Sequence, residues 1–397
     1  MTTPTELLQR HRPFLKYDSQ EPYFSDSAAE WTDNPGNRLV AGDGTVLAVG
    51  GDALTLGFLG ARYPDDRAAT PTDRIGDPSR EYEKQARAMH VKPGYANRVY
   101  GRVARDSHGD DWLQYWFFYF YNDYNLIGPF IKAGLHEGDW EMIQIHLAQG
   151  VPDRAVYAQH EHAEGRDWRQ VDLLPGTQRP IVYVARGSHA SYFEPGTQWT
   201  GHWFDQADGK RRSPELTLEV MDASQPAFHW LRWPGRWGDT KKSGDNPLDS
   251  DSPAGPAQHR QWKDPLALDG AARVAARALV PEGPPPIPPS PPQVTAEWHA
   301  DAIRLRYRVF ATTPDRWPVG VVVTLNSPDE IAPPTAERFP IRAHAGTLEL
   351  ETAVDPSHRY DIYASTVTPD ALASESVRVD LPPAEETRAR HRRRQGS

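Results

Sequence analysis

The chain has 397 residues, a formal net charge of −10 and no cysteine. Its length favours more than one domain. The lack of cysteine excludes disulfides, thiolate metal sites and a cysteine nucleophile, and the acidic balance argues against general nucleic-acid binding. No uninterrupted apolar run reaches the roughly 18 residues of a membrane-spanning helix, so we expect a soluble protein without a transmembrane segment.

The first 15 residues lack the apolar core of a signal peptide. We therefore expect a cytoplasmic location. Export would need an unconventional route, which the sequence leaves open.

Residues 1–270 predict a large β-sandwich domain with long loops and few short helices. A helix is expected at 78–90. Residues 113–121 are apolar or aromatic almost throughout, which is typical of a central strand covered on both faces. Residues 140–147 and 181–185 indicate further buried strands. A content of 38 prolines and many aromatic side chains favours strands joined by turns, so the fold class is expected to be mainly all-β.

A second unit follows a boundary at residues 271–292. This boundary combines an alanine-rich helix expected at 271–279 with a proline-rich run at 282–292, which is typical of a semi-rigid spacer. Residues 293–382 alternate apolar and polar side chains in short runs. They predict a small sandwich of the immunoglobulin or fibronectin type III kind. The basic stretch 383–397 is expected to be a solvated, disordered tail.

A motif His-x-x-Asp-Trp-Glu, beginning at His136, carries the candidate chemistry. On a strand, Asp139 and Glu141 share one face and lie about 7 Å apart along the backbone, so both carboxylates can reach one ion. His136 is expected in the loop before this strand, and Asp123 follows the preceding aromatic strand. Such ligands suit Mg²⁺ or Ca²⁺ first and Mn²⁺ second. The alternative is a hydrogen-bonded network of the same groups without a metal.

Two further histidines are candidate acid–base residues. His160 ends an expected strand, and His189 follows the strand expected at 181–185. A histidine at a strand end is commonly structural, but two of them on strands expected to be neighbours favour a site shared with the motif. Ser188 beside His189 does not indicate a catalytic triad, because adjacent residues on a strand face apart and no nucleophile elbow is present.

The order of the motifs resembles the vacuolar protein sorting-associated protein 62 family. The resemblance covers most of residues 10–265 and none of the C-terminal module. The segments that carry it are 12–21, 115–123, 136–141, 157–160, 183–190, 234–238 and 252–256. The molecular function of that family is poorly defined, so the resemblance implies no mechanism.

A more distant likeness implies a chemistry. The motif at His136, with an acidic residue after the upstream aromatic strand, is similar to the heptapeptide region of necrosis- and ethylene-inducing peptide-like toxins. Those β-sandwich proteins bind a divalent cation and use it to recognise plant sphingolipid head groups. The likeness implies as metal ligands Asp123, His136, Asp139 and Glu141. His160 and His189 fall where that family also has histidines, whereas Glu-Gly follows His136 where the toxins usually have Arg-His.

Three functions are consistent with these features. The leading hypothesis is a divalent-cation-dependent binding protein that recognises a glycan or lipid head group at the His/Asp/Glu site. The alternative is a metal-dependent hydrolase, in which the metal activates water and His160 or His189 moves protons. The third is a non-catalytic intracellular adaptor whose C-terminal module binds a protein partner. The sequence determines neither the ligand, the metal and the oligomeric state, nor whether the chain is an enzyme.

Overall fold

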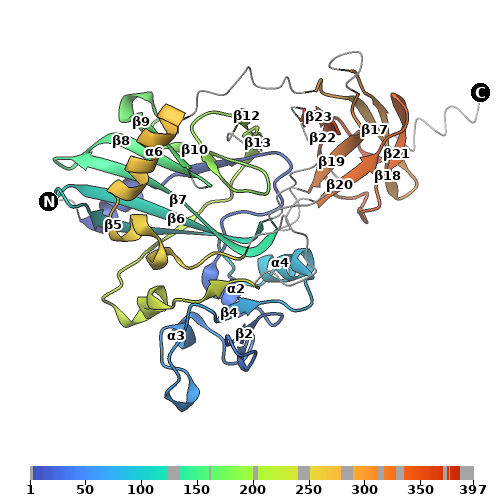
Figure 1. The fold of residues 1–397 in the computed structure, drawn as a ribbon. Helices are drawn as coiled ribbons and strands as arrows, with labels where there is room; N and C mark the ends of the chain where they lie inside the picture. The colour runs from blue at the N-terminus through green and yellow to red at the C-terminus, as the bar shows by residue number, and fades with distance from the viewer. Residues whose placement is uncertain are drawn as a thin grey trace, which may run out of the picture.

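The computed structural model describes residues 3–122, 135–160, 162–199, 204–239, 251–278, 289–311, 317–327, 335–369, 373–374 and 376–384. Strands predominate, which confirms the mainly β fold class, and the chain forms a large N-terminal part and a smaller C-terminal part (Figure 1). Within these ranges no helix is both long and apolar enough to cross a membrane.

A six-stranded sheet is the centre of the N-terminal part. In spatial order its strands are β15 (Thr217–Val220), β5 (Arg98–Arg105), β6 (Asp111–Asn122), β7 (His136–Ala148), β8 (Val151–Gln159) and β9 (His162–Asp167). All neighbours are antiparallel except β15 and β5. The expected buried strands at 113–121 and 140–147 lie within β6 and β7, and β6 is buried along nearly its whole length.

One face of this sheet packs on a second sheet. That sheet contains β11 (Ser191–Tyr192), β10 (Ile181–Val184), β1 (Phe14–Tyr17) and β14 (Arg211–Arg212) in spatial order. Leu15 and Val182 pack there against Tyr115, Phe117 and Ile143 in one buried cluster. Side chains of alternate residues on β6 and β7 therefore form a sandwich core, as the sequence predicts.

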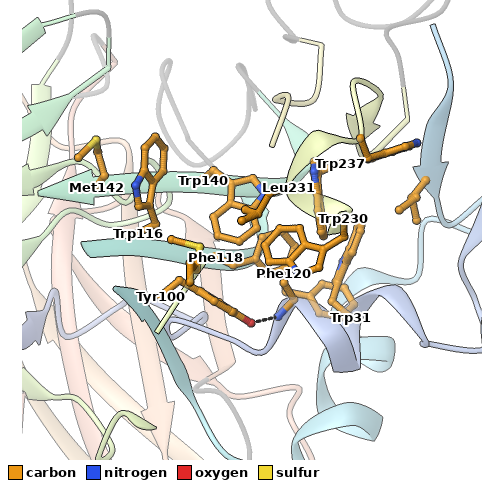
Figure 2. Packing of buried hydrophobic residues seen from close by; sticks show 14 of the residues in the cluster. Trp31, Tyr100, Trp116, Phe118, Phe120, Trp140, Met142, Trp230, Leu231 and Trp237 are labelled. Carbon is orange, nitrogen blue, oxygen red and sulfur yellow. Dashed lines mark hydrogen bonds between the residues drawn. The ribbon is translucent and has the colours of Figure 1, made fainter. Parts of the chain in front are cut away.

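The opposite face is covered by an aromatic cluster (Figure 2). Trp140 of the sheet stacks on Trp230 and meets Trp237 edge-on, and Phe118 packs against Trp237 and Trp31. The elements that supply and support these rings are α2 (Ala28–Thr32), β2 (Arg38–Val40), β3 (Val46–Val49), α3 (Leu56–Leu59), η1 (Pro64–Asp66), β4 (Arg74–Gly76), α4 (Tyr82–His90), η3 (Pro226–Arg232), β16 (Arg236–Trp237) and η4 (Pro256–Gln258). Large rings bury much area per side chain, so irregular segments suffice to cover the sheet.

The remaining described elements complete the N-terminal part. They are α1 (Pro4–Arg10), η2 (Trp168–Gln170), β12 (Gly196–Trp199), β13 (Phe204–Ala207), α5 (Arg260–Lys263) and α6 (Leu266–Ala278). A capping box at Thr3 and Glu6 starts α1. The helix expected at 271–279 forms the second half of α6, which packs on β8 and β9. The helix expected at 78–90 is the shorter α4.

The C-terminal part is a sandwich of two antiparallel sheets. One sheet contains β17 (Gln293–His299), β18 (Ala302–Arg308) and β21 (Ala345–Glu349), and the other contains β20 (Thr335–Pro340), β19 (Gly320–Asn326), β22 (Asp361–Val367) and β23 (Val377–Val379). Ile303 and Leu305 of the first sheet meet Val321 and Ile362 of the second. Most of the proline-rich run and most of the basic tail lie outside the described residues.

Candidate functional site

The two faces of β7 carry different acidic groups because of Gly138. Simple alternation would place Glu137 on the face of Asp139 and Glu141. Gly138 instead has a φ of 55°, and the carboxylate of Glu137 accepts the backbone N–H groups of Asp77 at 2.8 Å and Asp239 at 3.1 Å. A Cβ at Gly138 would lie 2.2 Å from the carbonyl oxygen of Trp237, so only glycine fits this position.

Asp139 is paired with a histidine that comes from the other sheet of the sandwich. His189 follows β10, is 0% exposed, and joins Asp139 Oδ2 through Nδ1 at 2.9 Å. Its Nε2 lies 3.4 Å from Glu21 Oε1. Burial alone would lower the pKa of His189, but Glu21 and Asp139 outweigh it and raise the pKa to about 10. His189 is therefore a buried imidazolium held between two carboxylates.

A second histidine forms a similar pair closer to solvent. His160 Nε2 lies 3.0 Å from Asp205 Oδ2, and 30% of the His160 side chain is exposed. Burial opposes its charge, yet Asp205 raises the pKa of His160 to about 9. Asp205 is fully buried and also accepts the hydroxyls of Ser188 at 3.0 Å and Tyr192 at 2.6 Å. Ser188 is thus a hydrogen-bond donor to Asp205.

Glu141 lies among these charged groups and is half-buried. Burial, followed by repulsion from Asp139, raises its pKa well above the usual range, while His160 and His189 act in the opposite direction. Within the described part of the chain its carboxylate accepts no hydrogen bond. We call Glu21, Asp139, Glu141, His160, His189 and Asp205 the Glu141 cluster. It has four carboxyl groups against two imidazoles.

The structure brings only some of the predicted residues into this cluster. Asp139, Glu141, His160 and His189 belong to it, whereas Asp123 lies outside the described residues. The expectation that His136 lies in a loop before the strand was wrong. His136 is the first residue of β7 and pairs with Asn122 of β6. Its Nδ1 lies 2.9 Å from the carbonyl oxygen of Gly138 and its Nε2 lies 2.8 Å from Asn122 Nδ2. Both ring nitrogens of His136 are therefore already used.

Sequence reasoning did not single out Glu21 or Asp205 as site residues. Glu21 follows β1, which pairs in parallel with β10 and so brings it near His189. Asp205 lies on β13. Neither has a local motif that marks it, because both depend on contacts between distant segments. The one sequence signal is that Glu21 ends the segment 12–21 of the family resemblance.

A divalent cation fits part of the cluster. Asp139 and Glu141 share a face, and among the described residues the carboxylate of Glu141 accepts no hydrogen bond, although His160 and His189 act on its charge from a distance. Mg²⁺ is commonly held by one or two carboxylates together with water, so these two residues suffice. His136, as arranged, does not fit as a ligand, because Asn122 and Gly138 occupy both ring nitrogens.

A different group is closer in space. Among the described residues, Asp106, Asp110 and His146 form the group whose possible metal-ligand atoms all lie within 4.8 Å of one another. Asp106, however, already accepts the backbone N–H groups of His108 and Asp110 and the indole N–H of Trp112. These bonds hold the turn between β5 and β6, and we assign this group to that turn.

Comparison with known proteins confirms the expected family. Residues 96–225 match the family described as vacuolar protein sorting-associated protein 62. The chain is 25% identical over 296 residues to the putative vacuolar protein sorting-associated protein TDA6 of Saccharomyces cerevisiae, covering 60% of this chain and 61% of that protein. It is 26% identical over 167 residues to vacuolar protein sorting-associated protein 62 of the same yeast, covering 33% of this chain and 35% of that protein. The chain thus spans less than two thirds of either relative.

Proposed function

We propose that this chain, whose residues 96–225 match the vacuolar protein sorting-associated protein 62 family, binds a polar head group through a divalent cation at the Glu141 cluster. Asp139 and Glu141 would hold the ion, with water and the ligand completing its shell. The ligand class is a glycan or lipid head group. Mg²⁺ or Ca²⁺ is the preferred ion, and Mn²⁺ is the third candidate.

The observation that carries this proposal is the state of Glu141. A half-buried carboxylate beside Asp139, to which no described residue donates a hydrogen bond, is destabilised by desolvation and by like charge. A bound cation would remove both penalties. The two imidazoles are less able to do so, because His189 is engaged with Asp139 and Glu21, and His160 with Asp205.

Asp205 keeps the partly exposed His160 protonated at neutral pH, which places a positive charge beside the proposed ligand. His189 is fully buried and acts as a positioning residue for Asp139. In the alternative of a metal-dependent hydrolase, proton transfer would therefore fall to His160 and not to His189.

Thermal unfolding after chelator treatment tests the cation. Saturation with ion at about 100 times its dissociation constant adds roughly 2.7 kcal/mol of stability. We expect Mg²⁺, Ca²⁺ or Mn²⁺ to raise the melting temperature of the wild type and to leave Glu141→Gln unchanged. Glu219→Gln is the matched control, because Glu219 lies on the same sheet and burial raises its pKa too. A wild type without any shift would defeat the proposal and favour the metal-free network.

Co-sedimentation with vesicles tests the ligand class. Vesicles of phosphatidylcholine with a neutral glycosphingolipid should retain the wild type only when the cation is present. Retention by phosphatidylcholine alone, or retention unaffected by chelator, would contradict recognition through the ion. Release of a soluble product from the glycolipid would instead support the hydrolase.

A further inference from the structure

The C-terminal module docks on the N-terminal part through Gln20. The side-chain amide nitrogen of Gln20 donates to Ser365 Oγ at 2.7 Å and to Ser376 Oγ at 2.9 Å. The ammonium group of Lys210 donates to the carbonyl oxygen of Ser376. These hydroxyls and this carbonyl belong to the module, so polar contacts define the junction.

A pocket of about 160 Å³ lies at this junction. The residues that line it are Asp18, Arg186, Pro195, Gly196, Gln206, Asp208, Lys210, Ser374 and Ser376. Both parts of the chain contribute, and no aromatic ring or large aliphatic side chain is among them. The volume and the lining suit a small polar ligand.

The two carboxylates of the lining are already used. Asp18 accepts the backbone N–H groups of Gln20 at 3.0 Å and Asp208 at 3.1 Å, one on each oxygen. Asp208 accepts the backbone N–H groups of Ser19 and Lys210 on one oxygen and the hydroxyl of Ser19 on the other. Neither acid therefore has an oxygen without a donor.

The donors of the lining are not exhausted. Gln206 is only 9% exposed, and its Oε1 accepts the Thr197 hydroxyl at 3.1 Å. Its buried Nε2 finds no acceptor among the described residues. Arg186 has five N–H donors, of which Nη1 donates to Gln20 Oε1 at 2.5 Å. A buried donor without an acceptor is unfavourable, so a ligand oxygen that accepts from Gln206 Nε2 would stabilise the pocket.

We propose that this interdomain pocket binds an oxyanion group, a phosphate or a carboxylate, of a small ligand. Arg186 and Lys210 contribute positive charge, with Lys210 Nζ also 3.7 Å from Asp208 Oδ2, and Gln206 Nε2 is a donor that nothing in the described chain satisfies. Arginine matches the geometry of such groups through its planar fork. Ser374 and Ser376 close the pocket from the module, so the C-terminal module is part of a binding site. This site is distinct from the Glu141 cluster.

Isothermal titration calorimetry on the full chain tests this proposal. Inorganic phosphate and acetate are titrated in separate arms, with chloride as the salt control, into protein freed of cations by chelator and then dialysed to remove the chelator. We expect heat and a higher melting temperature with at least one oxyanion and none with chloride. The stronger arm identifies the phosphate or the carboxylate. Equal, unsaturable responses to all three salts would overturn the proposal.

Gln206→Glu is the decisive variant. It keeps the acceptor for Thr197 but replaces the free donor with a negative charge, and should weaken oxyanion binding at least tenfold. Gln258→Glu, the same change at an exposed glutamine of η4, should bind as the wild type does. Unchanged or tighter binding by Gln206→Glu would refute the site.

A second pair of variants tests the site independently, in case Gln206→Glu does not fold. Lys210→Met removes a pocket charge, and Lys263→Met removes one from the end of α5. Only Lys210→Met should weaken the oxyanion, whereas equal weakening would indicate unspecific attraction and contradict the proposal. Glu141→Gln should bind the oxyanion normally, so a failure of the cation proposal leaves this test intact.

Discussion

The imidazole of His189 lies flat on the ring of Tyr119, with ring centroids 3.9 Å apart and planes within 4° of parallel. Tyr119 belongs to β6 and faces Asp139 of β7 in register. A cation over an aromatic face is favourable, and the stack fixes the imidazolium so that Nδ1 meets Asp139. The sandwich core and the Glu141 cluster thus share this contact.

Replacement of His189 should destabilise the fold strongly. His189→Leu removes the cation between Asp139 and Glu21, and leaving buried charges without a partner is unfavourable by about 3–5 kcal/mol. Urea unfolding at pH 7 measures the loss. Adding Asp139→Asn to His189→Leu should recover part of the lost unfolding free energy, because one of the two unpaired buried carboxylates is then neutral. A double variant no more stable than His189→Leu would contradict the ion pair as the cause.

Asp205 should control the titration of His160. In Asp205→Asn the pKa of His160 is expected to fall from about 9 toward the ordinary histidine range, because the acid that stabilises the imidazolium is gone. NMR titration of the His160 ring protons reads this directly. Asp172→Asn serves as the control at an exposed carboxylate. A His160 pKa that stays near 9 in Asp205→Asn would show that another group holds the proton.

Gly138→Ala should be much more damaging than the same change at Gly150. Both glycines have positive φ, 55° and 81°, which is unfavourable for alanine by roughly 1 kcal/mol. A Cβ at Gly138 also meets the Trp237 carbonyl at 2.2 Å, whereas none of the neighbouring atoms lies within 4 Å of a Cβ at Gly150. Denaturant unfolding of the two variants compares them. Equal losses would mean that the backbone at Gly138 relaxes freely.

Stability should fall as pH rises toward 7 because of Asp18. Burial and then repulsion from Asp208, partly offset by Arg186, raise the pKa of Asp18 to about 7 from an ordinary 3.8. The folded state thus holds a proton that the unfolded chain has lost, and the unfolding free energy decreases across this window by at most about 1.4 kcal/mol per pH unit. Unfolding curves from pH 4 to 8 should show a shallower decline in Asp18→Asn. Parallel declines in both proteins would assign the effect to other groups.

Local patterns in the sequence were sufficient for the strands and for one face of the site. The aromatic run at 113–121 predicts a strand covered on both sides, and β6 is that strand. Alternation places Asp139 and Glu141 on one face, and strict alternation in 293–382 predicts the C-terminal sandwich. These features depend on a period of two residues, which is a property of neighbouring positions alone.

The partners of those acids were decided by tertiary structure. Glu21 and Asp205 reach the Glu141 cluster through the parallel pairing of β1 with β10 and the position of β13. The positive φ of Gly138 turns the side chain of Glu137 to the opposite face of the sheet. The ring nitrogens of His136 contact the Asn122 side chain and the Gly138 carbonyl oxygen. Each depends on contacts between residues distant in the chain. A sequence therefore determines which acids share a strand face, whereas packing of distant segments determines which charges meet them.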